Sequence, residues 1–284
     1  INSIAYSLKK MLRILLMVAP FTLRIAISFR RCSHVNDTNE YMPNIEFRFS
    51  QIDRLRQIKS EEEISCIKEA CRISDAGFKA TLPFIRAGIT EARLRTILEC
   101  AMLEEGSEGK SFDTIVASGE RSAYPHGVAT GKVLEDGDLV TFDFGAIYKG
   151  YHSDITRTVA IGDISERLQK IYDSVLRCNE HIEMQLKEGI ICSEVDKSAR
   201  EYLKKDGFEA YFIHSLGHSV GLEIHESPFL SARDHTVLKE NMIETVEPGV
   251  YIPGIGGVRI EDTVVIKKDG IEVLTKFPKK FLRM

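Results

Sequence analysis

The hydrophobic positions between residues 60 and 106 recur at steps of three and four, which is the period of an amphipathic helix. Ser60 followed by Glu63 forms a capping box, a pattern typical of a helix start, and Gly88 is suited to end that helix. A second helix is expected from Thr90 to Gly106. The buried face of the first helix is predicted to contain Ile64, Ile67, Cys71, Ser74 and Phe78.

Strand patterns follow these helices, and two of them carry an acid. Leu139–Phe144 alternates so that Thr141 and Asp143 share one face, and Asp154–Ile161 is expected to return antiparallel to it after a turn at Lys149-Gly150. An acid on the inward face of an apolar strand is costly unless it is paired or bound to a metal ion. The competing interpretation is two surface aspartates beside a turn, where aspartate is common.

The second part of the chain repeats this plan. Helices are expected from Ser165 to Leu186 and from Ser193 to Gly207, and strands over Glu244–Val246 and Val258–Ile266. The last of these strands carries Glu261. Each half thus has two helices and a strand pair with acids, which predicts an α+β fold of two pseudo-symmetric halves with antiparallel sheet.

Composition and charge narrow the class of protein. The chain has 284 residues, 43% of them hydrophobic, and a net charge of −4, which argues against a nucleic-acid-binding protein. None of its six cysteines forms a C-x-x-C pair or brackets a histidine at zinc-finger spacing. We therefore expect free, buried thiols and a reducing, cytoplasmic location.

The first 50 residues have weak periodicity and are expected to be an N-terminal remnant or appendage, that is, a truncated N-terminal domain, ahead of a catalytic domain over residues 51–284. The apolar stretch Ile14–Leu23 resembles the core of a secretory signal, but Arg13 and Arg24 flank it, Pro20 interrupts it and no cleavage site follows. Ten apolar residues are too few for a bilayer, which needs about 20. No stable membrane span is expected.

Metal-type ligands are the main chemical signal of the chain. The candidates are four carboxylates and one imidazole, namely Asp143, Asp154, His218, Glu247 and Glu261. One nitrogen among many oxygens suits two hard or borderline divalent ions joined by bridging carboxylates. Such a pair supports metal-assisted hydrolysis.

Histidines are concentrated around the third of these candidate ligands, His218. His214, His218 and His225 occur within twelve residues, beside Gly217 and Gly221, which favours a site over three isolated polar residues. The spacing differs from the H-E-x-x-H motif of zinc peptidases. His126, in a Pro-His-Gly loop, is uninformative by itself.

Taken together, these segments resemble the M24 metallopeptidases of pita-bread fold, within their Xaa-Pro branch of prolidase and aminopeptidase P. The resemblance covers about residues 52–280. It is carried, in order, by Val116–Gly119, Pro125–Gly127, Asp143–Gly145, Gly150–Thr158, Gly217–His218, His225–Glu226, Glu247–Gly249 and Arg259–Asp262. The resemblance implies helices outside a central sheet.

The resemblance also implies a role for each metal ligand. Asp143 would chelate one ion, Asp154 and Glu261 would bridge both, and His218 and Glu247 would complete the other. Glu247 would also take a proton from the attacking water. The ions would be two divalent cations, with Mn²⁺ favoured by the oxygen-rich set and Co²⁺, Zn²⁺ or Fe²⁺ as alternatives.

The remaining roles concern the substrate, a proline-containing peptide. His126 and His225 would contact the scissile carbonyl, and His214 would line the pocket on the proline side. His152 and Arg259 would hold the ligands in place. The expected reaction is hydrolysis of the bond between an N-terminal residue and proline, by a dipeptidase or an aminopeptidase. A homodimer is one expected oligomeric state.

Two alternatives and two departures accompany this hypothesis. Methionine aminopeptidase shares the ligands, but His214 and the Tyr124-Pro125-His126 context favour the Xaa-Pro branch. A catalytically inactive binding protein of the same fold would be expected to lose ligands, whereas all are present here. The family often has glycine where this chain has Ser219, and usually a larger N-terminal domain.

Overall fold

Two helices followed by a set of strands occur twice along the chain, first over residues 61–160 (the first block) and again over residues 166–273 (the second block). The structure is a computed structural model and describes residues 53–284, of which Arg56–Met284 form one unit. The helices are α4 (Glu61–Thr81), α5 (Glu91–Glu104), α6 (Glu166–Gln185) and α7 (Cys192–Lys205), with short 3-10 turns η2 (Leu82–Phe84), η3 (Gly119–Ala123) and η4 (Glu209–Tyr211). The signal-like segment and the domain boundary predicted at residue 50 lie outside the described residues.

The strands of each block form an antiparallel sheet of three strands. The first sheet has the order β1 (Ile115–Ser118), β2 (Leu139–Phe144), β5 (Ile155–Ala160), and the second has the order β12 (Gly270–Val273), β11 (Asp262–Lys267), β8 (Ile243–Val246). The shorter pairs are β3 (Ile147–Tyr148) with β4 (Tyr151–His152), β6 (Gly217–Ser219) with β7 (Glu226–Leu230), and β9 (Gly249–Ile252) with β10 (Gly256–Arg259). The predicted α+β class is confirmed.

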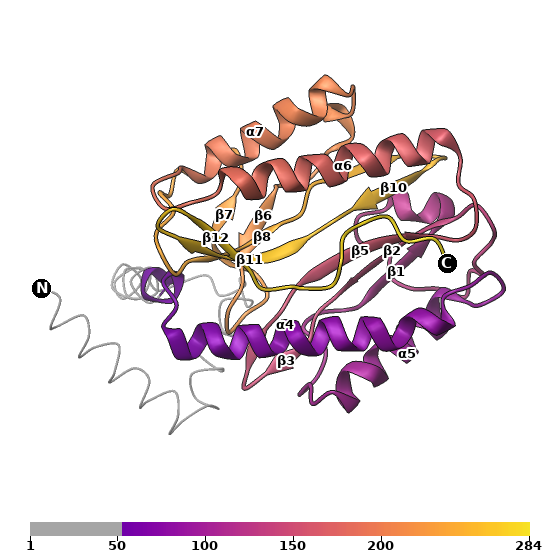
Figure 1. The fold of residues 1–284 in the computed structure, drawn as a ribbon, viewed down its shortest axis with the longest axis horizontal. Coiled ribbons are helices and arrows are strands. Elements are labelled where there is room, and N and C mark those ends of the chain that lie inside the picture. The colour runs from indigo at the N-terminus through magenta and orange to yellow at the C-terminus, as the bar shows by residue number, and fades with distance from the viewer. Residues whose placement is uncertain (1–52) are drawn as a thin grey trace, which may run out of the picture. The chain divides into compact units, whose positions relative to one another are not determined.

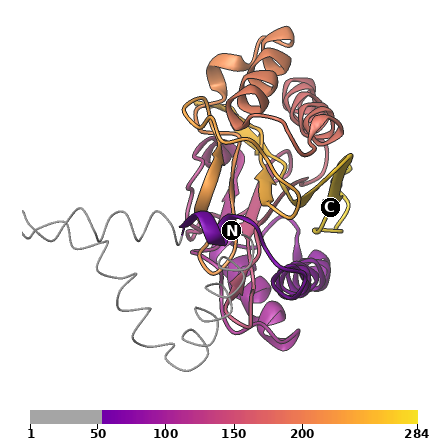
Figure 2. The same cartoon turned by 90° about the vertical axis from the view of Figure 1, so that its left-hand side faces the viewer.

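The helix pairs lie at opposite edges of these strands. Figure 1 shows α4 and α5 along one edge and α6 and α7 along the other. The view turned by 90° keeps this separation, with the orange helices above and the purple helices below (Figure 2). Helices α4 and α5 pack on the first sheet and α6 and α7 mainly on the second block, but Ile64 and Ile67 of α4 also pack on Ile243 and Val265 of the second sheet. Among residues 53–284, no helix has both the length and the apolar character needed to cross a membrane.

Most predicted helix starts are confirmed by their caps. The Ser60 hydroxyl accepts from Glu63 N at 3.4 Å while the Glu63 carboxylate accepts from Ser60 N at 2.8 Å. Thr90 and Ser165 likewise cap α5 and α6. The cap predicted at Ser193 is wrong, because α7 follows Ile191, whose extended backbone is fixed by a bridge to Val237. The Ser193 hydroxyl instead hydrogen-bonds His235 Nδ1 at 3.1 Å.

The buried helix face predicted from the sequence forms part of the hydrophobic core. Phe78 of α4 packs on Phe142 and Phe144 of β2, with ring centroids 5.2 Å apart in each pair. All predicted residues of the α4 face are buried. The expectation of buried thiols is only partly right, because Cys100 is exposed and Cys66 half-buried, whereas Cys71, Cys178 and Cys192 are buried.

One predicted strand is broken at a functional position. The segment expected over Val258–Ile266 divides into β10 and β11, and Glu261 stands in the gap between them. Glu261 N donates to Thr156 O of β5 at 3.2 Å instead of continuing a ladder within its own sheet. The break therefore joins the second block to the first at the site.

Candidate metal centre

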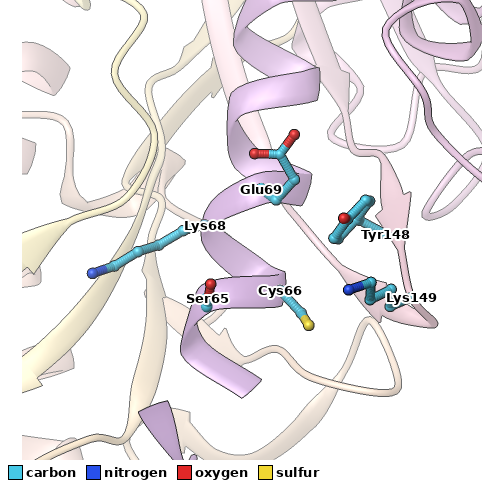
Figure 3. A pocket seen from close by; sticks show the side chains of 6 residues that line it. All are labelled: Ser65, Cys66, Lys68, Glu69, Tyr148 and Lys149. Carbon is cyan, nitrogen blue, oxygen red and sulfur yellow. The ribbon is translucent and has the colours of Figure 1, made fainter. Parts of the chain in front are cut away.

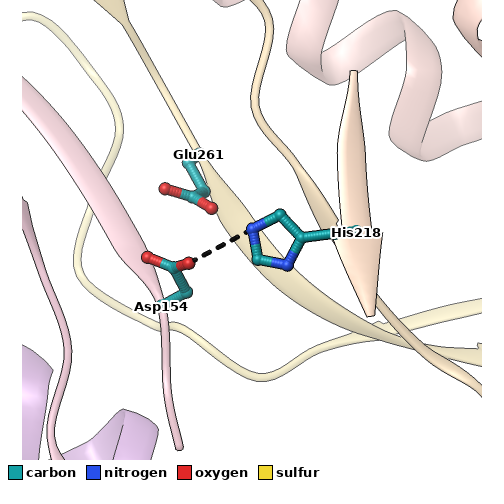
Figure 4. Close-up of side chains that lie close together, drawn as sticks. All are labelled: Asp154, His218 and Glu261. Atoms are coloured by element: carbon teal, nitrogen blue, oxygen red, sulfur yellow. Dashed lines mark ion pairs between the residues drawn. The ribbon is translucent and has the colours of Figure 1, made fainter. Parts of the chain in front are cut away.

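Three predicted ligands converge between the two blocks. One ligand atom each from Asp154, His218 and Glu261 lies within 4.8 Å of the others, and all three side chains are buried (Figure 4). Asp154 precedes β5, His218 lies in β6, and Glu261 stands between β10 and β11. Residues 107 positions apart thus meet as one cluster of two carboxylates and an imidazole.

Glu247 extends this cluster from the end of β8. Its Oε1 atom is 3.4 Å from His218 Nε2, which is also 3.6 Å from Asp154 Oδ2. The hydroxyl of Thr245 donates to Glu247 Oε1 at 3.2 Å and accepts from His218 N at 3.0 Å. Thr245 therefore sets Glu247 relative to His218, a role the sequence pattern did not indicate.

Asp143, on β2, acts electrostatically on the clustered acids. It raises the pKa of Asp154, of Glu247 and of Glu261, in each case adding to the larger effect of burial. Its Oδ2 atom accepts from Arg259 Nη2 at 2.5 Å. Asp143 is not one of the three residues whose ligand atoms lie within 4.8 Å of one another.

The pKa values of three clustered acids are raised above their usual range. Burial and the neighbouring carboxylates hold the pKa of Asp154 and of Glu261 well above ordinary values. Burial, opposed by Arg259 and reinforced by Asp143, raises the pKa of Glu247 to about 8. So many buried acids around one point are unfavourable as anions unless a cation compensates them.

The unsatisfied atoms of the cluster fit divalent cations. Among the described residues, Asp143 Oδ1, Asp154 Oδ1 and Glu261 Oε1 are buried without a hydrogen-bond partner. Burial and His225 lower the pKa of His218 to about 3, so its ring is neutral. Its Nδ1 donates to Ser219 O at 3.2 Å, which leaves the Nε2 lone pair facing the acids. A neutral imidazole held this way is the usual metal-binding form.

The other predicted histidines surround the same point. The His225 ring packs edge-on against the His218 ring, with centroids 4.4 Å apart, and His225 is an exposed residue. His126 is exposed in the loop after η3 and lowers the pKa of both His214 and His225 as a lesser effect beside burial. The structure therefore gathers His126, His214 and His225 near the acids.

His214 is fixed by a short chain of hydrogen bonds. Its Nδ1 donates to Ser215 O at 2.8 Å, and burial lowers its pKa to about 3, so Nε2 is an acceptor. The Tyr251 hydroxyl lies 2.8 Å from that atom and accepts from Arg259 Nη1 at 2.7 Å. Tyr251 therefore passes a hydrogen bond from Arg259 to His214.

Arg259 also reaches a ligand by a second route. Its Nε donates to Thr156 Oγ1 at 3.1 Å, and that hydroxyl donates to Glu261 Oε2 at 2.6 Å. This geometry agrees with the predicted holding role of Arg259. The His152 ring is 2.8 Å from Ser111 Oγ, and its backbone N–H donates to Gly221 O at 2.8 Å.

Two surface hollows lie apart from the cluster. One, of about 300 Å³, is bordered by α4 and the β3–β4 turn (Figure 3) and is lined by Ser65, Cys66, Lys68, Glu69, Tyr148 and Lys149. The other, of about 770 Å³, runs along α4 beside the C-terminal segment at Phe277 and Leu282. No candidate ligand lines either hollow, so neither is the metal centre.

Comparison with known proteins defines the class. The sequence model of metallopeptidase family M24 matches residues 65–268, and the chain belongs to this family. It is 49% identical over 231 residues to the Xaa-Pro dipeptidase of Pyrococcus furiosus, covering 81% of this chain and 66% of that protein. The chain thus spans just under two thirds of that relative.

Solved structures agree with this placement. The Xaa-Pro dipeptidase from Bacillus anthracis superposes with a TM-score of 0.81 at 51% identity, covering 82% of this chain and 66% of that one. The X-Pro aminopeptidase from Thermotoga maritima also gives 0.81, at 42% identity, covering 87% and 73%. The chain has the pita-bread fold of the M24 family, as expected from its motifs.

Proposed function

We propose that this chain is the catalytic part of a di-metal exopeptidase that hydrolyses the bond between an N-terminal residue and a following proline. The observation that carries the proposal is the meeting of Asp143, Asp154, His218, Glu247 and Glu261, with buried oxygens that lack a protein partner. Relatives at about half identity are named Xaa-Pro dipeptidases, which supports the substrate class.

The five side chains would hold two divalent cations. Bound there, such ions supply Lewis-acid polarisation of the scissile carbonyl and lower the pKa of a shared water from 15.7 to about 7. The oxygen-rich ligand set favours Mn²⁺ by ligand type. His218 contributes its Nε2 lone pair, and Arg259 holds Asp143 while leaving the other Asp143 oxygen without a protein partner.

The remaining steps belong to the chain's own groups. Glu247, whose carboxylate is held by the Thr245 hydroxyl beside His218, is suited to accept the proton of the attacking water and return it to the leaving nitrogen. His126 and His225 are exposed beside the acids, so either ring can donate to the carbonyl oxygen as negative charge develops there. His214, locked by Tyr251, forms a fixed wall on the proline side.

The imide bond explains why a dedicated site is needed. Proline lacks an N–H and has a restricted ring conformation, so a general peptide cleft that relies on that donor binds it poorly. The similar solved structures include an Xaa-Pro dipeptidase and an X-Pro aminopeptidase, so both dipeptides and longer peptides are candidate substrates. The cytoplasmic location and the homodimer stay predictions.

A direct assay tests the proposal. The purified chain with added Mn²⁺ is expected to cleave Gly-Pro, Ala-Pro-X, or both, and to leave Met-Ala-X and Gly-Ala intact. Cleavage of Met-Ala-X in preference would assign methionine aminopeptidase activity instead. Strong metal binding with no cleavage of any peptide would favour an inactive binding protein.

A further inference from the structure

A buried lysine lies just outside the predicted ligand set. Lys59 precedes the cap of α4, is 3% exposed, and donates its backbone N–H to Asn241 O at 2.9 Å. Its Nζ donates to Ser219 Oγ at 2.7 Å and lies 3.4 Å from Glu226 Oε2. A buried ammonium is costly unless its partners are well placed, so these contacts need an explanation.

The two partners of Lys59 occupy equivalent positions in the sequence. Ser219 directly follows His218, and Glu226 directly follows His225. Ser219 and Glu226 are paired across β6 and β7, after a register shift between His218 and Ser219. His218 Nε2 lies beside Asp154 and Glu247 whereas the Ser219 hydroxyl contacts Lys59. The His225 ring packs on His218 whereas the Glu226 carboxylate lies beside Lys59.

Ser219 also sets the tautomer of the ligand histidine. Its carbonyl accepts from His218 Nδ1 at 3.2 Å while its hydroxyl accepts from Lys59 at 2.7 Å. A shift of Ser219 would therefore rotate or displace the His218 ring. Glycine, which the family often has at this position, would remove the hydroxyl acceptor.

Glu226 organises the loop that leads to His225. Its Oε1 accepts from Glu223 N at 3.1 Å and from Arg56 Nη2. A Cβ atom at Gly221 would lie 2.5 Å from Glu226 Oε1, so the turn is closed tightly around this carboxylate. The position of His225 thus depends on where Glu226 is held.

A second buried acid near Lys59 also favours a positive charge at this position. Glu244 is fully buried, both of its carboxylate oxygens lack a hydrogen-bond partner, and Lys59 acts on it as a favourable charge. Glu226 and Glu244 therefore place two acids around one lysine.

We propose that Lys59 is a positioning residue that fixes Ser219 and Glu226 together and thereby sets the relative placement of His218 and His225. The inference rests on the proposed roles of these two histidines. It assigns a mechanistic task to the segment that enters α4, far in sequence from every candidate ligand.

Variants at both ends of the contact test this assignment. Lys59→Met removes the ammonium, and Ser219→Ala removes one acceptor without changing the charge. Lys68→Met is the matched control, since that lysine is exposed and pairs with Glu272 at 2.8 Å on the surface. Each purified protein is titrated with Co²⁺, and its visible absorption spectrum, kcat and KM for Gly-Pro are measured.

We expect Lys59→Met to change the Co²⁺ spectrum and to lower Co²⁺ affinity or kcat by about 10- to 100-fold, as for residues that orient metal ligands. Ser219→Ala is expected to act in the same direction and more weakly. Lys68→Met should match the wild type. KM should change less than kcat, because the side-chain partners of Lys59, Ser219 and Glu226, are not proposed to contact the substrate.

A purely structural role gives a different result. If Lys59→Met lowers the melting temperature while its spectrum, Co²⁺ affinity and kcat stay within twofold of the wild type, the assignment is overturned. If Lys59→Met does not fold, Ser219→Ala decides, and an unchanged spectrum and kcat in that variant overturn it. Wild-type protein that binds Co²⁺ but cleaves no Xaa-Pro peptide would refute the proposed function, while the spectra still test Lys59. Wild-type protein that binds no Co²⁺ would overturn both.

Discussion

Asp143 Oδ2 and Arg259 Nη2 form a hydrogen bond of 2.5 Å between residues 116 positions apart. The guanidinium also donates to Tyr251 Oη, Thr156 Oγ1 and Pro125 O, so one planar group joins β2, β5, β9 and the loop that carries His126. It places a fixed positive charge among acids that would otherwise repel. The arrangement predicts that Arg259 cannot be replaced by a simple charge.

Arg259→Lys keeps the charge but loses the planar fork of donors. We expect metal affinity or kcat to fall by about 10- to 100-fold, because a lysine cannot hold Asp143 and Thr156 at once. Metal titration and steady-state kinetics measure this. Arg72→Lys, at an exposed pair with Glu105, serves as control and should be silent. Wild-type metal affinity and kcat in Arg259→Lys would show that charge alone suffices.

His218→Ala tests the ligand assignment. Loss of Nε2 removes a ring nitrogen that lies 3.6 Å from Asp154 and 3.4 Å from Glu247, so we expect lower metal occupancy and loss of turnover. Metal content after gel filtration and Gly-Pro hydrolysis are the measurements. His235→Ala, an exposed histidine bonded to Ser193, is the matched control. Near-normal occupancy and activity in His218→Ala would refute the assignment.

His225→Ala separates metal binding from catalysis. Its ring packs on His218 but is exposed toward solvent, as a donor to substrate should be. We expect both metals to be retained and kcat to fall by about 10²-fold or more, as for a lost oxyanion donor. An unchanged kcat would remove His225 from the mechanism.

The raised carboxyl pKa values predict how pH acts on the metal-free protein. Burial, opposed by Arg259 and reinforced by Asp143, raises the pKa of Glu247 from 4.5 to about 8, so Glu247 binds its proton more tightly when folded than when unfolded. Its stabilising contribution is therefore complete below about pH 4.5 and is lost as pH rises through about 8. Asp154 and Glu261 act in the same direction.

Divalent cations should reverse this trend, because they bind the deprotonated carboxylates and gain affinity as pH rises. Calorimetric melting temperatures between pH 5 and 8.5, with EDTA or with Mn²⁺, measure the effect. Glu247→Gln is the control, and its metal-free curve should be flatter than that of the wild type. A metal-free wild type that grows more stable toward pH 8 would contradict the prediction.

Local sequence patterns were enough to predict most helices and strands. The capping box at Ser60 and Glu63 and the alternation of Leu139–Phe144 were read correctly, since each depends on neighbours a few residues away. Ser193 was misjudged because the start of α7 is set by pairing of Ile191 with Val237, a contact that no local pattern records. The break in the last predicted strand arises in the same way, from the bond of Glu261 to β5.

The sequence by itself determined which residue types could bind metal and, through its motifs, the family in which they occur. Only the tertiary structure brought Asp154, His218 and Glu261 within 4.8 Å of one another, set Glu247 beside His218, and placed Lys59 against Ser219 and Glu226. The reason is physical. Helix and strand periods are fixed by short-range hydrogen bonds and side-chain spacing, whereas the burial and pairing of a charge depend on which distant strands pack together.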